Sequence, residues 1–132
     1  MNRKFYVSLE AAKLLKEKGY NEVCEQCFYY NDYHDKWDFD SPYNLFDDDP
    51  MFYTNKTIDD EMYSMPTKAE AIDWLESKGM TIEIHWIRFN ENRRWNYSIF
   101  NCSTCDTIDT KYICTTRLEA EDAAIIKALE LL

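Results

Sequence analysis

The chain has 132 residues, and its 25 Asp and Glu outnumber its 15 Lys and Arg, which gives a formal net charge of −10. This length predicts one globular domain over residues 1–132, and two glycines are too few for phosphate-binding loops of the Walker or Rossmann type. The sequence has no apolar run for a signal peptide or a membrane span, so we expect a cytoplasmic protein with reduced cysteines. Its acidity disfavours binding to nucleic acid and to anionic lipid.

The N-terminal part begins with a predicted helix over residues 8–18. Gly19 stops this helix, because glycine readily takes the left-handed conformation that ends a helix. A short strand is expected at residues 27–30, where apolar and aromatic residues follow one another.

Residues 31–61, which we call the acidic-aromatic segment, differ in composition from the rest of the chain. They hold ten acidic residues against Lys36 and Lys56, so that their charge of −8 is most of the total. They also hold seven aromatic residues, too many for a disordered acidic tail. We therefore expect a long ordered or semi-ordered loop with one short strand around residues 51–54, and a loop of this length in a small domain is usually functional or disordered.

Two further helices begin at capping boxes, in which a hydroxyl accepts from the third helical amide and a glutamate reaches back. The first box is residues 67–70, and its helix stops at Lys78 and Gly79. The second box is residues 116–119, and its helix continues to the C-terminus.

Between these two helices the apolar residues alternate with polar ones, which predicts three strands. The alternating stretches are residues 82–86, 95–99 and 108–114. The order α-β-β-β-α over residues 67–132 predicts an α+β fold, in which helices pack on one face of a three-stranded antiparallel sheet in two layers. Residues 1–66 add the N-terminal helix and the acidic-aromatic segment.

Two Cys-x-x-Cys pairs give the most specific chemical signal. Cys24 with Cys27 and Cys102 with Cys105 could supply four thiolates to one structural zinc ion, and we expect no other cofactor. The alternative is free thiols, because the 74 residues between the pairs exceed the usual compact spacing. In addition, Cys27 begins an apolar run, where a thiol behaves as a small hydrophobe.

Arginine and tryptophan are concentrated in the predicted hairpin 85–95. His85, Arg88, Arg93 and Arg94 could hold a nucleotide by phosphate pairing and base stacking. The alternative is that the two tryptophans of this hairpin face the core while the arginines neutralise the acidic-aromatic segment.

The C-terminal helix, residues 116–132, resembles the last helix of double-stranded-RNA-binding domains, and the three strands before it fit the same order. Those domains place lysines at the start of this helix to grip RNA phosphates. The matching positions here are Arg117, Leu118 and Glu121. The resemblance therefore implies a similar fold without the RNA-binding function.

A second resemblance covers nearly the whole chain and links it to a group of small uncharacterised proteins carried by phages and prophages of gut Bacteroides-type bacteria. It rests on residues 5–10, 16–20, 27–30, 65–67, 74–75 and 119–132. The resemblance implies an accessory protein that acts in the cytoplasm of an infected or lysogenic bacterial cell. The acidic-aromatic segment departs from the group.

The sequence favours a binding protein over an enzyme, since no serine stands in a nucleophile elbow and the paired carboxylates read as a charged surface. We expect the acidic-aromatic segment to occupy a basic site on a host protein, as phage proteins that mimic DNA do. The residues expected at this contact are Tyr33, Trp37, Asp38, Phe39, Asp40, Tyr43, Asp47, Asp48 and Asp49.

Two other functions stay open. The hairpin residues could form a sponge that sequesters a nucleotide immune signal, either within one chain or across a homodimer. The chain could also be a structural or assembly component of a phage, in which the acidity maintains solubility.

Overall fold

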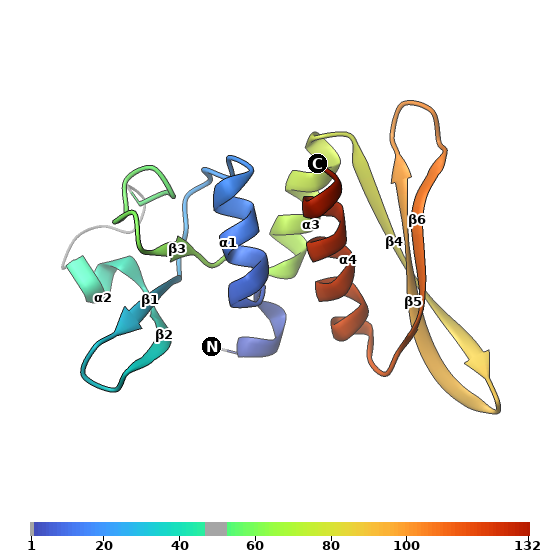
Figure 1. Cartoon of the computed structure of the whole chain (residues 1–132), viewed down its shortest axis with the longest axis horizontal. Coiled ribbons are helices and arrows are strands. Elements are labelled where there is room, and N and C mark those ends of the chain that lie inside the picture. The colour runs from blue at the N-terminus through green and yellow to red at the C-terminus, as the bar shows by residue number, and fades with distance from the viewer. Residues whose placement is uncertain (1, 47–52) are drawn as a thin grey trace. The chain divides into compact units, whose positions relative to one another are not determined.

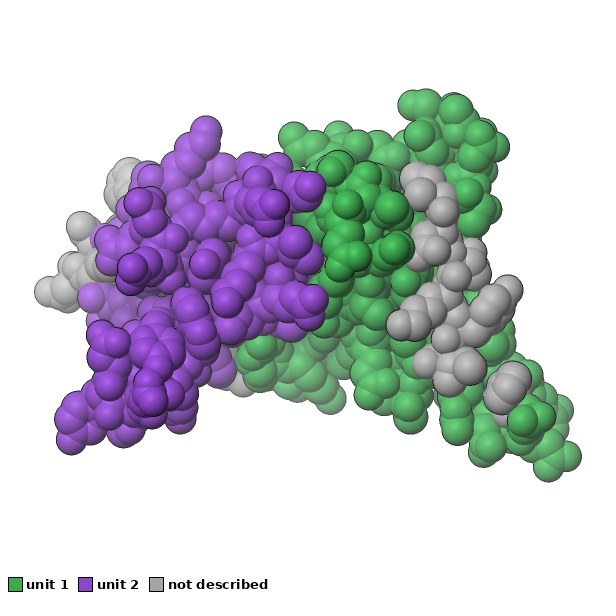
Figure 2. Space-filling view, in the orientation of Figure 1, with its two compact units in different colours: residues 1–5, 68–132 green, residues 6–67 purple. Residues whose placement is uncertain are grey.

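The computed structural model describes residues 2–46 and 53–132 and shows an α+β protein with two antiparallel sheets, so the predicted class is confirmed. The chain divides into two compact units, which Figure 2 shows in different colours. The N-terminal unit is Tyr6–Thr67, and the C-terminal unit is Lys68–Leu132 with Met1–Phe5. Among the described helices, none combines the length and the apolar character needed to cross a membrane.

The C-terminal unit has the predicted order of elements. They are a 3₁₀ turn η1 (Arg3–Phe5), α3 (Lys68–Ser77), β4 (Met80–Phe89), β5 (Asn92–Asn101), β6 (Thr107–Cys114) and α4 (Arg117–Leu131). The sheet runs β4-β5-β6; α3 packs against α4 and β4, and α4 also packs against β4 and β5 (Figure 1). Small side chains of α4, such as Ala124 and Ala128, are fully buried, which lets that helix approach its neighbours closely.

The hairpin between β4 and β5 turns on two residues, Asn90 and Glu91. Both have positive φ angles, 48° and 65°. A two-residue turn with this backbone matches the right-handed twist of the flanking strands, and asparagine tolerates it well. The turn fixes the register, in which Trp86 lies opposite Trp95 and Arg88 lies opposite Arg93.

The N-terminal unit packs a helix against a second small sheet. Its elements are α1 (Leu9–Glu17), β1 (Cys27–Asn31), β2 (Lys36–Asp40), α2 (Pro42–Phe46) and β3 (Tyr63–Ser64). Ser8 caps α1, since its Oγ accepts a hydrogen bond from the N–H of Ala11 at 3.2 Å, and Gly19 ends the helix region with a φ of 95°. The predicted first helix and the strand at residues 27–30 are therefore confirmed.

The acidic-aromatic segment differs from the predicted long loop, because it contains β2 and α2. The signal for β2 was the alternation of Trp37 and Phe39 with charged residues, which the high acidic content of the segment obscured. Of the strand expected at residues 51–54, the first two residues lie outside the described chain, and Tyr53 and Thr54 are not in a strand.

The sheet of the N-terminal unit runs β2-β1-β3, and its register separates two faces of different character. One face carries the aromatic side chains of Phe28, Tyr30, Trp37, Phe39 and Tyr63. The other face carries Cys27, Tyr29, Lys36, Asp38, Asp40 and Ser64. We call the face with the five aromatic side chains the inner face and the opposite face the outer face.

Candidate functional site

The inner face is covered by lysines of α1. The Nζ of Lys13 lies 5.0 Å from the ring centroid of Trp37 and 5.8 Å from that of Tyr63, and the Nζ of Lys16 lies 5.3 Å from that of Tyr63. These are cation–π distances. The chain therefore supplies its own cations to this face of the sheet.

Lys16 also holds the acidic turn at residues 59–62. Its Nζ donates to the backbone carbonyls of Asp59 at 3.1 Å, Asp60 at 3.2 Å and Met62 at 2.7 Å. Burial lowers the pKa of Lys16, while the charges of Asp60 and Asp59 act in the opposite direction. Lys16 thus holds the carbonyls of this turn, and the charges of two of the turn's carboxylates act on the same lysine.

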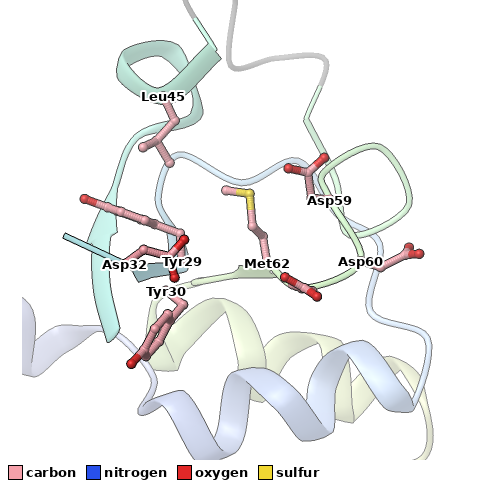
Figure 3. A pocket seen from close by; sticks show the side chains of 8 residues that line it. Tyr29, Tyr30, Asp32, Leu45, Asp59, Asp60 and Met62 are labelled. Carbon is pink, nitrogen blue, oxygen red and sulfur yellow. The ribbon is translucent and has the colours of Figure 1, made fainter. Parts of the chain in front are cut away.

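A cavity of about 570 Å³ lies on the outer side of the unit, between β1, α2 and the turn (Figure 3). Its carboxylates are Asp32, Asp59, Asp60 and Glu61, and its other lining residues are Tyr29, Tyr30, Leu45 and Met62. In Figure 3, Asp32 and Asp59 lie on opposite sides of Met62, and Asp60 points outward at the rim. The ring of Tyr30 points toward α1, which leaves Tyr29 as the ring on the outer face.

The floor of the cavity is apolar. Met62 is 8% exposed and belongs to a buried cluster with Cys27 and Ile58. Tyr29 and Leu45 pack against this cluster. Because these side chains come from three separate segments, which are β1, α2 and residues 58–62, their packing fixes the shape of the floor.

The charges around the cavity are unbalanced. In the part of the chain that the structure describes, none of its four carboxylates forms an ion pair. The pKa of Tyr29 is raised, first by burial and then by the nearby charges of Asp38 and Asp40. The pKa of Tyr30 is also raised, first by its hydrogen bond to Asp35. The cavity is therefore a site of negative potential with an apolar floor.

The residues expected at the partner contact have different positions. Tyr33, at the turn between β1 and β2, is 90% exposed. Trp37 and Phe39 lie on the inner face, whereas Asp38 and Asp40 lie on the outer face beside Tyr29. Tyr43 belongs to α2, and residues 47–49, which are Asp47, Asp48 and Asp49, lie outside the described chain.

The alternative ligand residues of the C-terminal hairpin do not share one face. By register, Arg88 and Arg93 lie on the same face as Trp86, and His85 and Arg94 lie on the opposite one. The guanidinium of Arg93 covers the ring of Trp86 at 5.6 Å, although Trp86 is 59% exposed. His85 contacts Glu83 at 3.3 Å.

The two cysteine pairs belong to different units. Cys24 and Cys27 are buried in the N-terminal unit, and their thiols donate to the carbonyls of Tyr53 at 3.4 Å and of Asp40 at 3.6 Å. Burial raises the pKa of Cys24 to about 11 and that of Cys27 to about 12.

The other pair, Cys102 and Cys105, is exposed in the C-terminal unit, where the Sγ of Cys102 lies 2.9 Å from the Oγ1 of Thr81. Among the described residues, no three His, Cys, Asp or Glu side chains are grouped to hold a metal ion. The structure thus separates the two pairs by unit and by exposure.

Sequence reasoning did not place Tyr29 and the turn at residues 59–62 in one site. Tyr29 lies in a run of aromatic residues that reads as wholly buried, and only strand alternation could have placed it on the outer face. The turn reads as one more acidic stretch, because its contact with Lys16 joins residues far apart in the chain.

Comparison of the chain with models of known families, with curated proteins and with solved structures found no match.

Proposed function

We propose that the protein is a non-enzymatic binding protein of phage or prophage origin, and that its acidic-aromatic segment engages a basic site on a host protein in the bacterial cytoplasm. The observation that supports this function is the cavity on the outer side of the N-terminal unit. It combines four carboxylates that have no ion-pair partner in the described chain with a floor of apolar side chains. Such a surface attracts cations and gains further affinity from apolar contact.

The charge of the whole chain acts in the same direction. A formal net charge of −10 repels nucleic acid and draws basic surfaces toward the protein before contact. Basic sites that normally hold DNA or RNA phosphates are host surfaces of this kind, and carboxylates can take the place of the phosphates there. We therefore propose that binding blocks a nucleic-acid site of the host protein.

The nucleotide-sponge alternative has less support. Its four residues divide between the two faces of the β4–β5 hairpin, and the exposed ring of Trp86 is already covered by Arg93. A nucleotide held by phosphate pairing and base stacking needs these groups on one side.

The test is the capture of host proteins from bacterial extract by the immobilised protein, with duplex DNA as the competitor. The variant Asp59→Asn/Asp60→Asn/Glu61→Gln removes three negative charges from the cavity. The control Glu17→Gln/Glu22→Gln/Glu25→Gln removes three exposed charges elsewhere in the same unit. We expect the cavity variant to bind its partner about tenfold more weakly and with a smaller salt dependence, and the control to bind like the wild type.

Duplex DNA is expected to release the captured protein from the wild type. If the cavity variant holds the same host proteins at the same salt concentration as the control, the cavity is not the contact surface and the proposed function is wrong.

A further inference from the structure

We infer that the cavity of the N-terminal unit takes an arginine side chain from the partner protein, with the guanidinium against Tyr29 and between the carboxylates of Asp32 and Asp59. The inference rests on the proposed function and specifies the chemical group that the host protein presents.

The inner face of the same sheet shows how this unit binds a cation. There, Lys13 and Lys16 lie over aromatic rings, and Lys16 also bonds three oxygens of the turn at residues 59–62. An aromatic ring combined with oxygen acceptors from that turn is a cation site that the chain fills with its own lysines.

The outer face has the same kinds of groups, and Lys36, which the register places at the end of this face opposite Asn31, does not line the cavity. Tyr29 supplies the ring, the turn supplies carboxylates, and Asp32 supplies another carboxylate from the turn between β1 and β2. Neither Asp32 nor Asp59 forms an ion pair in the described part of the chain. The outer face is therefore complementary in charge to a cation that comes from outside this chain.

The geometry favours arginine over lysine. Asp32 and Asp59 lie on opposite sides of Met62 in Figure 3, and a planar guanidinium carries donors on several edges that can face two carboxylates at once. Its flat face can also stack on a tyrosine ring, which an ammonium group cannot do. The cavity volume of about 570 Å³ admits a long side chain together with its backbone, and the apolar floor of Leu45 and Met62 suits the methylene stem.

Calorimetric titration with three peptides of the same length and spacing tests this inference. The peptides carry two arginines, two lysines or two citrullines, and citrulline keeps the shape of arginine without its charge. We expect the arginine peptide to bind, the lysine peptide to bind about fivefold more weakly, and the citrulline peptide to give no heat of binding.

Variants of the chain locate the site. Tyr29→Leu and, separately, Asp32→Asn/Asp59→Asn are each expected to weaken arginine-peptide binding about tenfold. Tyr33→Leu and Glu22→Gln/Glu25→Gln are the matched controls, because these exposed residues do not line the cavity. Since Tyr29 packs against the buried cluster, Tyr29→Phe is included as a variant that keeps the ring, and it should bind like the wild type.

Two results would contradict the inference. One is equal binding of the arginine and lysine peptides by both the wild type and Tyr29→Leu, and the other is binding of citrulline as strong as that of arginine. Either would leave the proposed function standing if the host-protein capture still depends on the turn carboxylates. Conversely, peptide binding that depends on Tyr29 without any effect on host-protein capture would refute the proposed function and support the arginine site.

Discussion

Individual carboxylates of the acidic-aromatic segment have two different roles. Asp38 accepts a hydrogen bond from the N–H of Phe39 at 2.9 Å, and Asp40 accepts from the N–H of Ser41 at 2.8 Å and from Asn44 at 2.9 Å. Both lie on or beside the edge strand β2, where a charged side chain disfavours pairing with a further strand. The carboxylate of Asp59 makes no such local hydrogen bond in the described chain, and its charge acts on Lys16. Acidic composition alone cannot separate these roles.

The buried thiols give a pH dependence at the residue scale. The folded pKa values of Cys24 and Cys27, about 11 and about 12, lie above the value of about 8.5 for an unfolded chain. The unfolded state therefore loses these protons first as the pH rises, and the free energy of unfolding falls from about pH 8.5 upward, by on the order of 2–3 kcal/mol for each of the two thiols near pH 10.5.

Urea unfolding followed by circular dichroism at several alkaline pH values measures this loss. In Cys24→Ala/Cys27→Ala, the decrease of stability with pH should be smaller, whereas Cys102→Ala/Cys105→Ala, which removes exposed thiols, should keep the wild-type slope. Identical slopes in the two double variants would show that the buried thiols do not cause the dependence.

At the scale of elements, α4 shows how a local motif sets a helix boundary. The Oγ1 of Thr116 accepts from the N–H of Glu119 at 3.1 Å, and Glu119 Oε2 accepts from the N–H of Thr115 at 3.1 Å. The predicted capping box is present, with its return bond made one residue earlier than in the standard form. This bond pattern needs only neighbouring residues, and the sequence was therefore sufficient to predict it.

The cap at α4 leads to a stability prediction. Thr116→Ala removes the acceptor for the first turn of the helix and should lower the free energy of unfolding by about 1 kcal/mol. Thr115→Ala is the matched control, because residue 115 contributes its backbone N–H, which alanine retains. Urea denaturation at neutral pH compares the two variants, and an equal loss in both would contradict the assigned role of Thr116.

At the scale of the whole molecule, the two units hold one cysteine pair each. Zinc binds thiolates, and burial favours the protonated thiols of Cys24 and Cys27, which donate to backbone carbonyls. From this hydrogen bonding we predict that Cys24 and Cys27 are free thiols, which is the alternative to the zinc site.

Native mass spectrometry of protein purified without chelator tests this alternative. We expect the mass of the chain with no added zinc, and modification of Cys102 and Cys105 by a thiol reagent well before the three buried cysteines, because only these two are exposed. An added mass of zinc that acid removes, together with protection of all four paired cysteines, would instead establish a zinc site across the two units.

The sequence by itself determined the elements that depend on local patterns. The glycine stops after the two helices and the three alternating strands of the C-terminal unit are signals carried by neighbouring residues, and they predicted the α+β class. The acidic character of residues 31–61 is equally visible in the sequence, and most of the residues that line the cavity belong to this segment.

Only the tertiary structure decided which acidic and aromatic residues form a site. Trp37 and Tyr29 are both aromatic residues of short strands, yet the register of β1 and β2 places Trp37 under the lysines of α1 and Tyr29 on the outer face. The turn at residues 59–62 reaches the cavity because Lys16, over 40 positions earlier, holds its carbonyls. Strand pairing and this long-range contact join segments distant in sequence, so no local pattern could reveal them.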